Sequence, residues 1–141
     1  AGSVAQAPAP VDEAAFLPSA APAKDGAPFE LALIKAMIAA ANADGHIGPE
    51  EQRGIFDQVD GMALDAEDKA LVFDTLRNPP GLADIAALAS GPEQAAELYL
   101  VSRLAIDVDH PAETAYLEAL AARLALPADL VAQLDAQADA A

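Results

Sequence analysis

The chain lacks cysteine altogether, and it has few basic residues, few aromatic residues and no long apolar run. Without cysteine it can form neither a disulfide framework nor a thiolate zinc site, and it has no cysteine nucleophile. Seven lysines and arginines face 23 aspartates and glutamates, which gives a formal net charge of -16. Such a surface repels phosphate backbones and disfavours nucleic-acid binding, so cations and basic proteins are the natural ligands.

Sequence features of membrane spans and secretory leaders are also absent. No apolar stretch reaches the roughly 18 residues of a membrane span, and the longest candidate, residues 31–41, is interrupted by Lys35. The first residues do not follow a basic region with an apolar one, as a signal peptide would. Residues 1–3 read Ala-Gly-Ser without an initiator methionine, so we expect a cloning remnant and a missing natural upstream region.

Alanine and leucine dominate what is present, and this composition favours helices. Residues 1–28 mix proline with alanine and are predicted to be a disordered tether. Residues 29–141 are predicted to form one all-α domain of about seven helices with short connections. The expected helices cover about 29–43, 49–60, 65–77, 82–89 and 92–106, then a helix carrying residues 117–124 and a last one from 127.

Two of the expected helices, residues 29–43 and 92–106, are apolar nearly all round, which is typical of central, buried helices. Each of them runs into a stretch with one shared design. We call residues 39–52 the first elbow and residues 104–117 the second elbow. Both lead through an aspartate, a histidine and a proline to a glutamate at the start of the next helix. The sequence therefore predicts two pseudo-repeated helix–acidic elbow–helix units.

The spatial relation of the two elbows is left open by the sequence. Central helices that cross nearly parallel would place the elbows side by side, whereas antiparallel helices would place them at opposite ends. If the elbows meet, they gather carboxylates and the chain's only two histidines in one place.

Seven side chains of the elbows are candidate metal ligands. Carboxylates offer hard oxygen ligands, and a histidine would shift the preference toward zinc or manganese. The competing interpretation is helix capping, in which the aspartates accept backbone amides and the glutamates reach back from the first turn. The candidates are Asp44, His46, Glu51, Asp107, Asp109, His110 and Glu113.

Asp107 is a special case, because a negative charge at the end of a buried helix opposes the helix dipole. We expect it to need a partner, for which Arg103, Lys35, His46 or a bound ion are available.

The first elbow also shares five positions with an EF-hand calcium loop. The first ligating position of that loop is occupied by Ala40, which lies inside an apolar helix, and Pro49 stiffens the turn. We therefore interpret the likeness as shared turn mechanics. The five matching residues are Asn42, Asp44, Gly45, Ile47 and Glu51.

Catalytic motifs find little support. Ser102 lies between apolar residues and is expected to bond to its own backbone, and Tyr99 and Tyr116 are expected in the core. The sequence contains no glycine-rich phosphate loop, no nucleophile elbow and no HExxH motif, and neither histidine has an adjacent serine nucleophile. No catalytic residue is assigned.

The residues that carry these features resemble a known family. Residues 33–47 with Glu51, and residues 97–110 with Glu113, are similar to the YebE-like bacterial family of unknown function, itself related to the TerB-like, tellurite-resistance-associated helical domains. The likeness covers about residues 29–136 and is most specific in Ala105-Ile-Asp-Val-Asp-His110.

The resemblance implies a TerB-like fold. It also implies that a glycine-rich apolar segment upstream associates full-length relatives with the inner membrane, leaving this domain soluble on the cytoplasmic side. A metal-binding centre has been suggested for TerB-like domains, and it would correspond here to the five elbow carboxylates: Asp44, Glu51, Asp107, Asp109 and Glu113.

Three hypotheses of function follow. The first is a non-enzymatic, stress-associated module whose acidic elbows bind a divalent cation or a basic protein partner. The second is a metal-dependent hydrolase that uses the same carboxylates with a histidine as base. The third is a purely structural or interaction domain whose elbows only cap helices. The oligomeric state is left open.

Overall fold

The computed structural model describes residues 21–62, 64–106 and 109–140, and over these residues it is all-helical. This confirms the prediction of an all-α bundle, and the observed helix ends lie within a few residues of the expected ones. The helices are α1 (Phe29–Ala41), α2 (Pro49–Asp60), α3 (Ala66–Arg77), α4 (Leu82–Ala86), α5 (Pro92–Leu104), α6 (Pro111–Arg123) and α7 (Ala128–Ala140).

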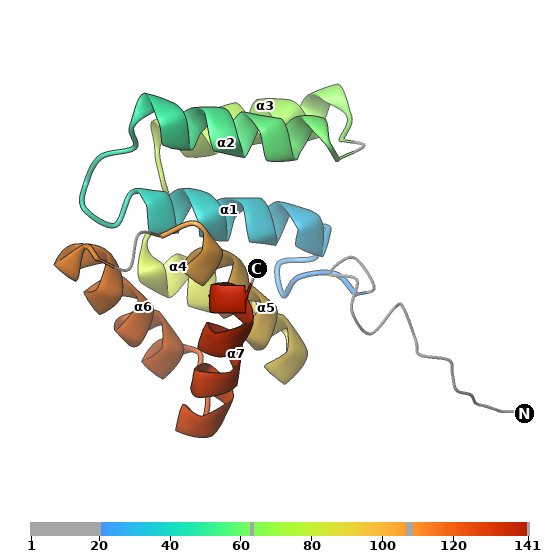
Figure 1. Cartoon of the computed structure of the whole chain (residues 1–141). Helices are drawn as coiled ribbons and strands as arrows, with labels where there is room; N and C mark the ends of the chain where they lie inside the picture. Colours follow the sequence, from blue (N-terminus) through green and yellow to red (C-terminus); the bar gives the residue numbers. More distant parts are fainter. Residues whose placement is uncertain (1–20, 63, 107–108, 141) are drawn as a thin grey trace, which may run out of the picture.

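Helix α1 is the centre of the fold. Ten of its 13 residues are buried, as its nearly all-round apolar sequence predicts. Figure 1 shows α2 and α3 on one side of α1 and the remaining helices on the other. In the described residues, apolar clusters therefore lie on both sides of this one helix.

One of these clusters joins α1 to the α2–α3 pair. Ile34 and Ile38 of α1 pack there with Ile55 of α2 and Val72 of α3. On the opposite side of α1, two further clusters join it to α4, α5, α6 and α7. They contain Phe29, Ala36, Ala40, Ile85, Leu98, Tyr99, Leu117, Leu120 and Leu134.

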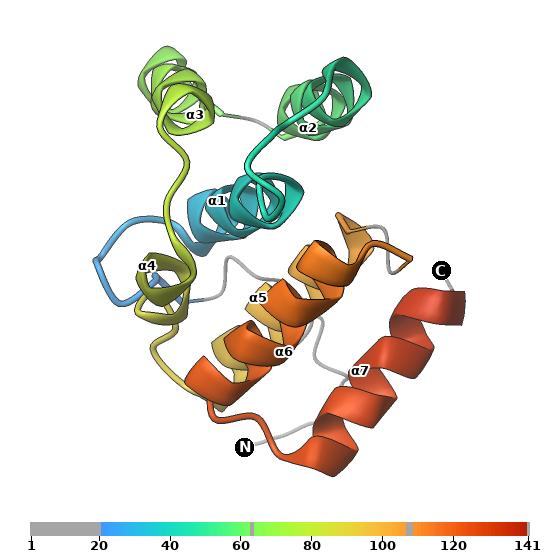
Figure 2. The ribbon, with the colours of Figure 1, turned by 90° about the vertical axis from the view of Figure 1, so that its left-hand side faces the viewer.

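The three helices that precede α4 in the sequence and the three that follow it make similar sets of contacts. α1 packs against α2 and α3, and α5 packs in the same way against α6 and α7. Among the described helices the most extensive contact is between α1 and α5, which join the two units. Figure 2 looks along this junction and shows the two three-helix units on either side of it.

Helix α5 is less enclosed than its sequence predicts. Ser102 and Leu98 are fully buried, but Leu104 at its C-terminal end is 53% exposed. The prediction that this helix is buried all round, like α1, is therefore wrong for its last turn. The physical reason is that α2 and α3 pack mainly against α1, which leaves the last turn of α5 only partly covered.

Helix α7 is held against α5 by polar contacts as well as by Leu134. The Tyr99 hydroxyl donates a hydrogen bond to Asp135 Oδ1 over 2.7 Å, and Arg103 pairs with Asp135 and with Asp139. Burial and the bond to Asp135 raise the pKa of Tyr99, while burial raises the pKa of Tyr116 to about 12. Tyr99 is buried and both tyrosines pack against the core clusters, as predicted.

Residues 21–28, which the sequence assigns to the tether, lie against α4 and α5. Ala23 is buried, and the Lys24 amide donates to the Leu88 carbonyl over 2.9 Å. The Gln94 side-chain amide donates to the Ala21 and Pro22 carbonyls. This segment therefore covers the N-terminal end of α5.

Helix α6 ends in a Schellman motif without glycine. Ala125 has a φ of +57°, and the Leu126 and Ala125 amides donate to the Ala121 and Ala122 carbonyls. A left-handed conformation places the β-carbon of alanine against its own backbone, a cost that glycine avoids.

We predict that Ala125→Gly raises the free energy of unfolding by about 1 kcal/mol, since it removes this strain. Ala119→Gly, at an exposed position inside α6, should lower it by a similar amount because glycine disfavours a helix interior. Urea denaturation followed by circular dichroism compares the two variants. Destabilisation by both would contradict the assignment of strain to Ala125.

Candidate functional site

Two local bonds hold the first elbow, and one of them, from Glu51, is the bond that the capping interpretation predicts, whereas Asp44 binds a loop amide before the helix cap. Asp44 Oδ1 accepts a hydrogen bond from the His46 amide over 3.0 Å, while Gly45 makes the sharp bend with a φ of +86°. Glu51, three residues after Gly48, accepts a bond from the Gly48 amide over 2.8 Å. Asp44 and His46 are both exposed.

The second elbow has its proline and glutamate at the same positions relative to the following helix. Pro111 occupies the first turn of α6 as Pro49 does in α2, and Glu113 stands three residues after the helix cap His110. Glu113 is only 5% exposed, and its Oε2 lies 3.8 Å from His110 Nδ1. Asp109 is exposed, and Asp107 lies outside the described residues.

The two elbows lie at the same side of the molecule. Ala41 at the end of α1, Glu51 of the first elbow and Ala105 of the second elbow line one pocket. The relation that the sequence left open is thereby decided: the C-terminal ends of α1 and α5 are neighbours.

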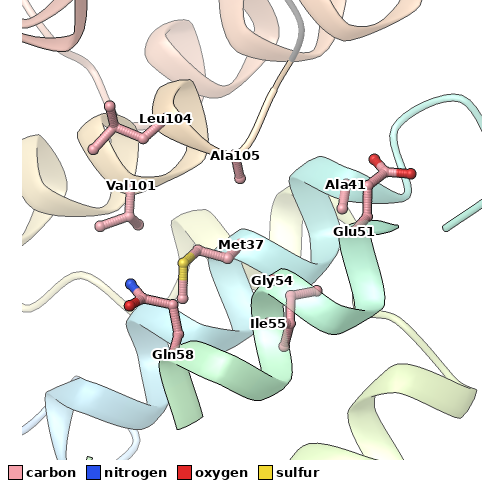
Figure 3. Close-up of a pocket in the computed structure, with 9 residues that line it drawn as sticks. All are labelled: Met37, Ala41, Glu51, Gly54, Ile55, Gln58, Val101, Leu104 and Ala105. Carbon is pink, nitrogen blue, oxygen red and sulfur yellow. The ribbon is translucent and has the colours of Figure 1, made fainter. Parts of the chain in front are cut away.

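This pocket, which we call the α2–α5 groove, has a volume of about 300 Å³. Its floor is α1, and its walls are α2 and the last turns of α5 (Figure 3). The lining side chains recur at helical spacing on each wall, so each helix presents one face to the groove. They are Met37, Ala41, Glu51, Gly54, Ile55, Gln58, Val101, Leu104 and Ala105.

The interior of the groove is apolar and its ends are polar. Figure 3 shows Val101 pointing toward Met37 across the opening, with Leu104 about one turn further along α5. The carboxylate of Glu51 lies beside Ala41 at one end, and the Gln58 amide lies near Met37 at the other. A site of this kind can hold aliphatic side chains and a polar group at its end.

Gly54 widens the groove. It lies in the middle of α2, where glycine costs helix stability. A β-carbon placed on it would meet no atom within 4 Å outside the local backbone. The groove therefore has open space at position 54, where any other residue would place a side chain.

Glu97 extends the polar boundary along α5. It precedes Val101 by four residues and therefore lies on the same side of the helix, beyond the end of the groove marked by Val101. Burial, and then the charge of Glu93, raise the pKa of Glu97. A positive charge at this point would relieve both effects.

The predicted metal centre finds no assembled counterpart among residues 21–62, 64–106 and 109–140, where no three acidic or histidine side chains are grouped to hold an ion. Two of the partners considered for Asp107 are engaged elsewhere: Arg103 pairs with α7, and Lys35 lies 4.0 Å from Asp25. Because Asp107 is outside the described residues, metal binding stays a prediction.

Sequence reasoning missed the groove because it assigned Met37, Val101 and Leu104 to the core. Their apolar character is the same in a core and in an open cleft. The one available signal was Gly54, a glycine inside an otherwise regular helical segment. Ser102 is as predicted, with its hydroxyl donating to the Leu98 carbonyl over 2.7 Å.

Comparison with known proteins places the chain among uncharacterised bacterial sequences. Residues 2–138 match the family described as "Protein of unknown function (DUF533)". The chain is 34% identical over 99 residues to the "Uncharacterized protein in ampR 5'region" of Yersinia enterocolitica, a match that covers 70% of each chain. No solved structure matches significantly. Within the described residues, none of the helices has the length and apolarity needed to traverse a bilayer.

We predict that Glu51→Ala lowers the free energy of unfolding by about 1 kcal/mol, because it removes the acceptor for the Gly48 amide. Glu50→Ala removes the same charge from the same turn of α2 and should cost much less. Glu51→Gln keeps an acceptor oxygen and should also cost little. Equal losses in Glu51→Ala and Glu50→Ala, measured by urea denaturation, would contradict the capping role.

The metal prediction has its own test. Calcium, magnesium, manganese and zinc are titrated separately into the purified chain in a calorimeter. A cation held by both elbows would give a heat of binding that Glu51→Gln and Asp109→Asn each reduce, and it would raise the melting temperature. The absence of heat with all four ions would contradict a metal site.

Proposed function

The chain belongs to the DUF533 family, a family of unknown function, and we propose that it is a non-enzymatic module that binds an apolar segment of a protein partner in the α2–α5 groove. The observation that carries this proposal is the open apolar groove itself, with Leu104 53% exposed at its rim. Large apolar side chains left uncovered around a cleft are typical of interaction sites.

The chemistry of the groove favours binding over catalysis. Six of its nine lining residues are apolar besides glycine, and Glu51, the one titratable group among them, is bonded to the Gly48 amide. An active site would instead need convergent groups that could exchange protons with a substrate. The metal-dependent hydrolase hypothesis therefore gains no support from the described residues.

Two finer proposals come from the resemblance noted in the sequence. One is that the domain is TerB-like and takes part in stress or tellurite resistance. The other is that an upstream segment tethers it to the inner membrane on the cytoplasmic side. The seven helices of the described residues and the paired elbows are compatible with the first, and the second concerns sequence outside this chain.

Binding in the groove is tested with a synthetic helical peptide. One face of this peptide is a stripe of leucines, and all its other positions are glutamine. Titration into protein with labelled methyl groups should shift the signals of Met37, Val101 and Leu104. Leu71 of α3, which is also exposed but lies outside the groove, serves as the control for unspecific adhesion.

Gly54 offers the matched pair of variants. Gly54→Phe should fill the groove and weaken binding at least about tenfold. Gly54→Ala should leave binding nearly unchanged and raise the free energy of unfolding by about 1 kcal/mol, because alanine favours a helix interior. Methyl shifts that are confined to Leu71, or binding that Gly54→Phe leaves intact, would contradict the proposal.

A further inference from the structure

We propose that the α2–α5 groove selects a basic amphipathic helix, with an apolar stripe over Met37, Val101 and Leu104 and with lysine or arginine side chains about two turns apart that meet Glu51 and Glu97. This rests on the groove being a binding site. It adds the class of partner and the way in which charge selects it.

The basic residues of the three helices that form the groove face away from it. Each helix carries a single one: Lys35 on α1, Arg53 on α2 and Arg103 on α5. Helical spacing places each on the side of its helix away from the lining residues. Lys35 lies near Asp25, and Arg103 pairs with Asp135 and Asp139.

The acidic residues are distributed differently. Glu51 lines the groove, and Glu97 shares a helix face with Val101 and Ala105. Both are half-buried, so neither charge is as well hydrated as on an open surface, and a cationic partner would compensate for this. The charge presented toward an incoming segment is therefore negative at both ends.

The separation of these two carboxylates sets the spacing on the partner. Residue 97 and residue 105 are eight positions apart on α5, which corresponds to about 12 Å along a helix. Glu51 lies at the Ala105 end of the groove (Figure 3). A helix lying along the groove would span the same length with side chains about seven or eight residues apart, which is two turns.

A helical occupant fits the shape better than a strand. The groove is bounded by side chains of two helices over a third, and no exposed sheet edge is available for strand addition in the described residues. Helices bind such grooves through anchors at positions i, i+3 or i+4 and i+7. A second copy of this chain is disfavoured because each copy carries a net charge of -16.

Three peptides that share one leucine stripe test the inference. The first has two lysines seven residues apart on the flanks of the stripe, the second has glutamine at those positions, and the third has glutamate. We expect affinity to fall in that order, and the advantage of the lysine peptide over the glutamine peptide should shrink as salt is added.

Variants that replace one glutamate by glutamine show which carboxylates cause the preference for the lysine peptide. Glu51→Gln and Glu97→Gln should each weaken binding of the lysine peptide about threefold and leave the glutamine peptide unchanged. Glu51→Gln retains the acceptor for the Gly48 amide, so the elbow is preserved. Glu50→Gln and Glu118→Gln remove equal charges away from the groove and serve as controls.

The outcomes separate the two proposals. Equal affinity of the three peptides, with the groove methyl signals still shifted, would overturn the charge selection and leave the groove as a binding site. Equal losses in the control and groove variants would also overturn it, because the net charge alone would then explain the preference. If none of the peptides shifts the signals of Met37, Val101 and Leu104, the groove proposal falls and this inference falls with it.

Discussion

The burial of α1 on both sides is the constraint on which the rest of the structure depends. A helix that is apolar nearly all round can be stable in water only if other helices enclose it. Here the α2–α3 pair and the α4–α7 group cover opposite sides of it. Because the two groups reach α1 from different directions, they do not close over it completely, and the α2–α5 groove is the remaining gap above Met37 and Ala41.

The first elbow explains why one end of this gap is polar. A proline in the first turn and a glutamate three residues after the cap start α2 and α6 alike, and Gly45 redirects the chain at the first elbow. Tight turns of this kind place the start of α2 beside the end of α1. Glu51 is therefore at once a cap and a wall of the groove.

The sequence was sufficient for the helices and for the cap at Glu51, because periodicity and capping are local properties. It could not supply the parallel crossing of α1 and α5, since this depends on how many helices are available to cover each side. Leu104 shows the limit clearly: its apolar spacing is that of a core residue, yet it is 53% exposed. Conversely, Glu113 is a charged residue of an elbow, where an exposed side chain is expected, yet it is buried and only 5% exposed.

Charge explains how an apolar groove can stay open. Self-association through Leu104 and Met37 would bury apolar area, but it would also bring together two surfaces that carry excess carboxylates, and this repulsion opposes the gain. The three basic residues of the groove helices do not relieve it, because helical spacing turns each of them away from the opening. A cationic amphipathic helix would avoid the repulsion and bury the same apolar area, so the proposed selection would act by penalising acidic partners.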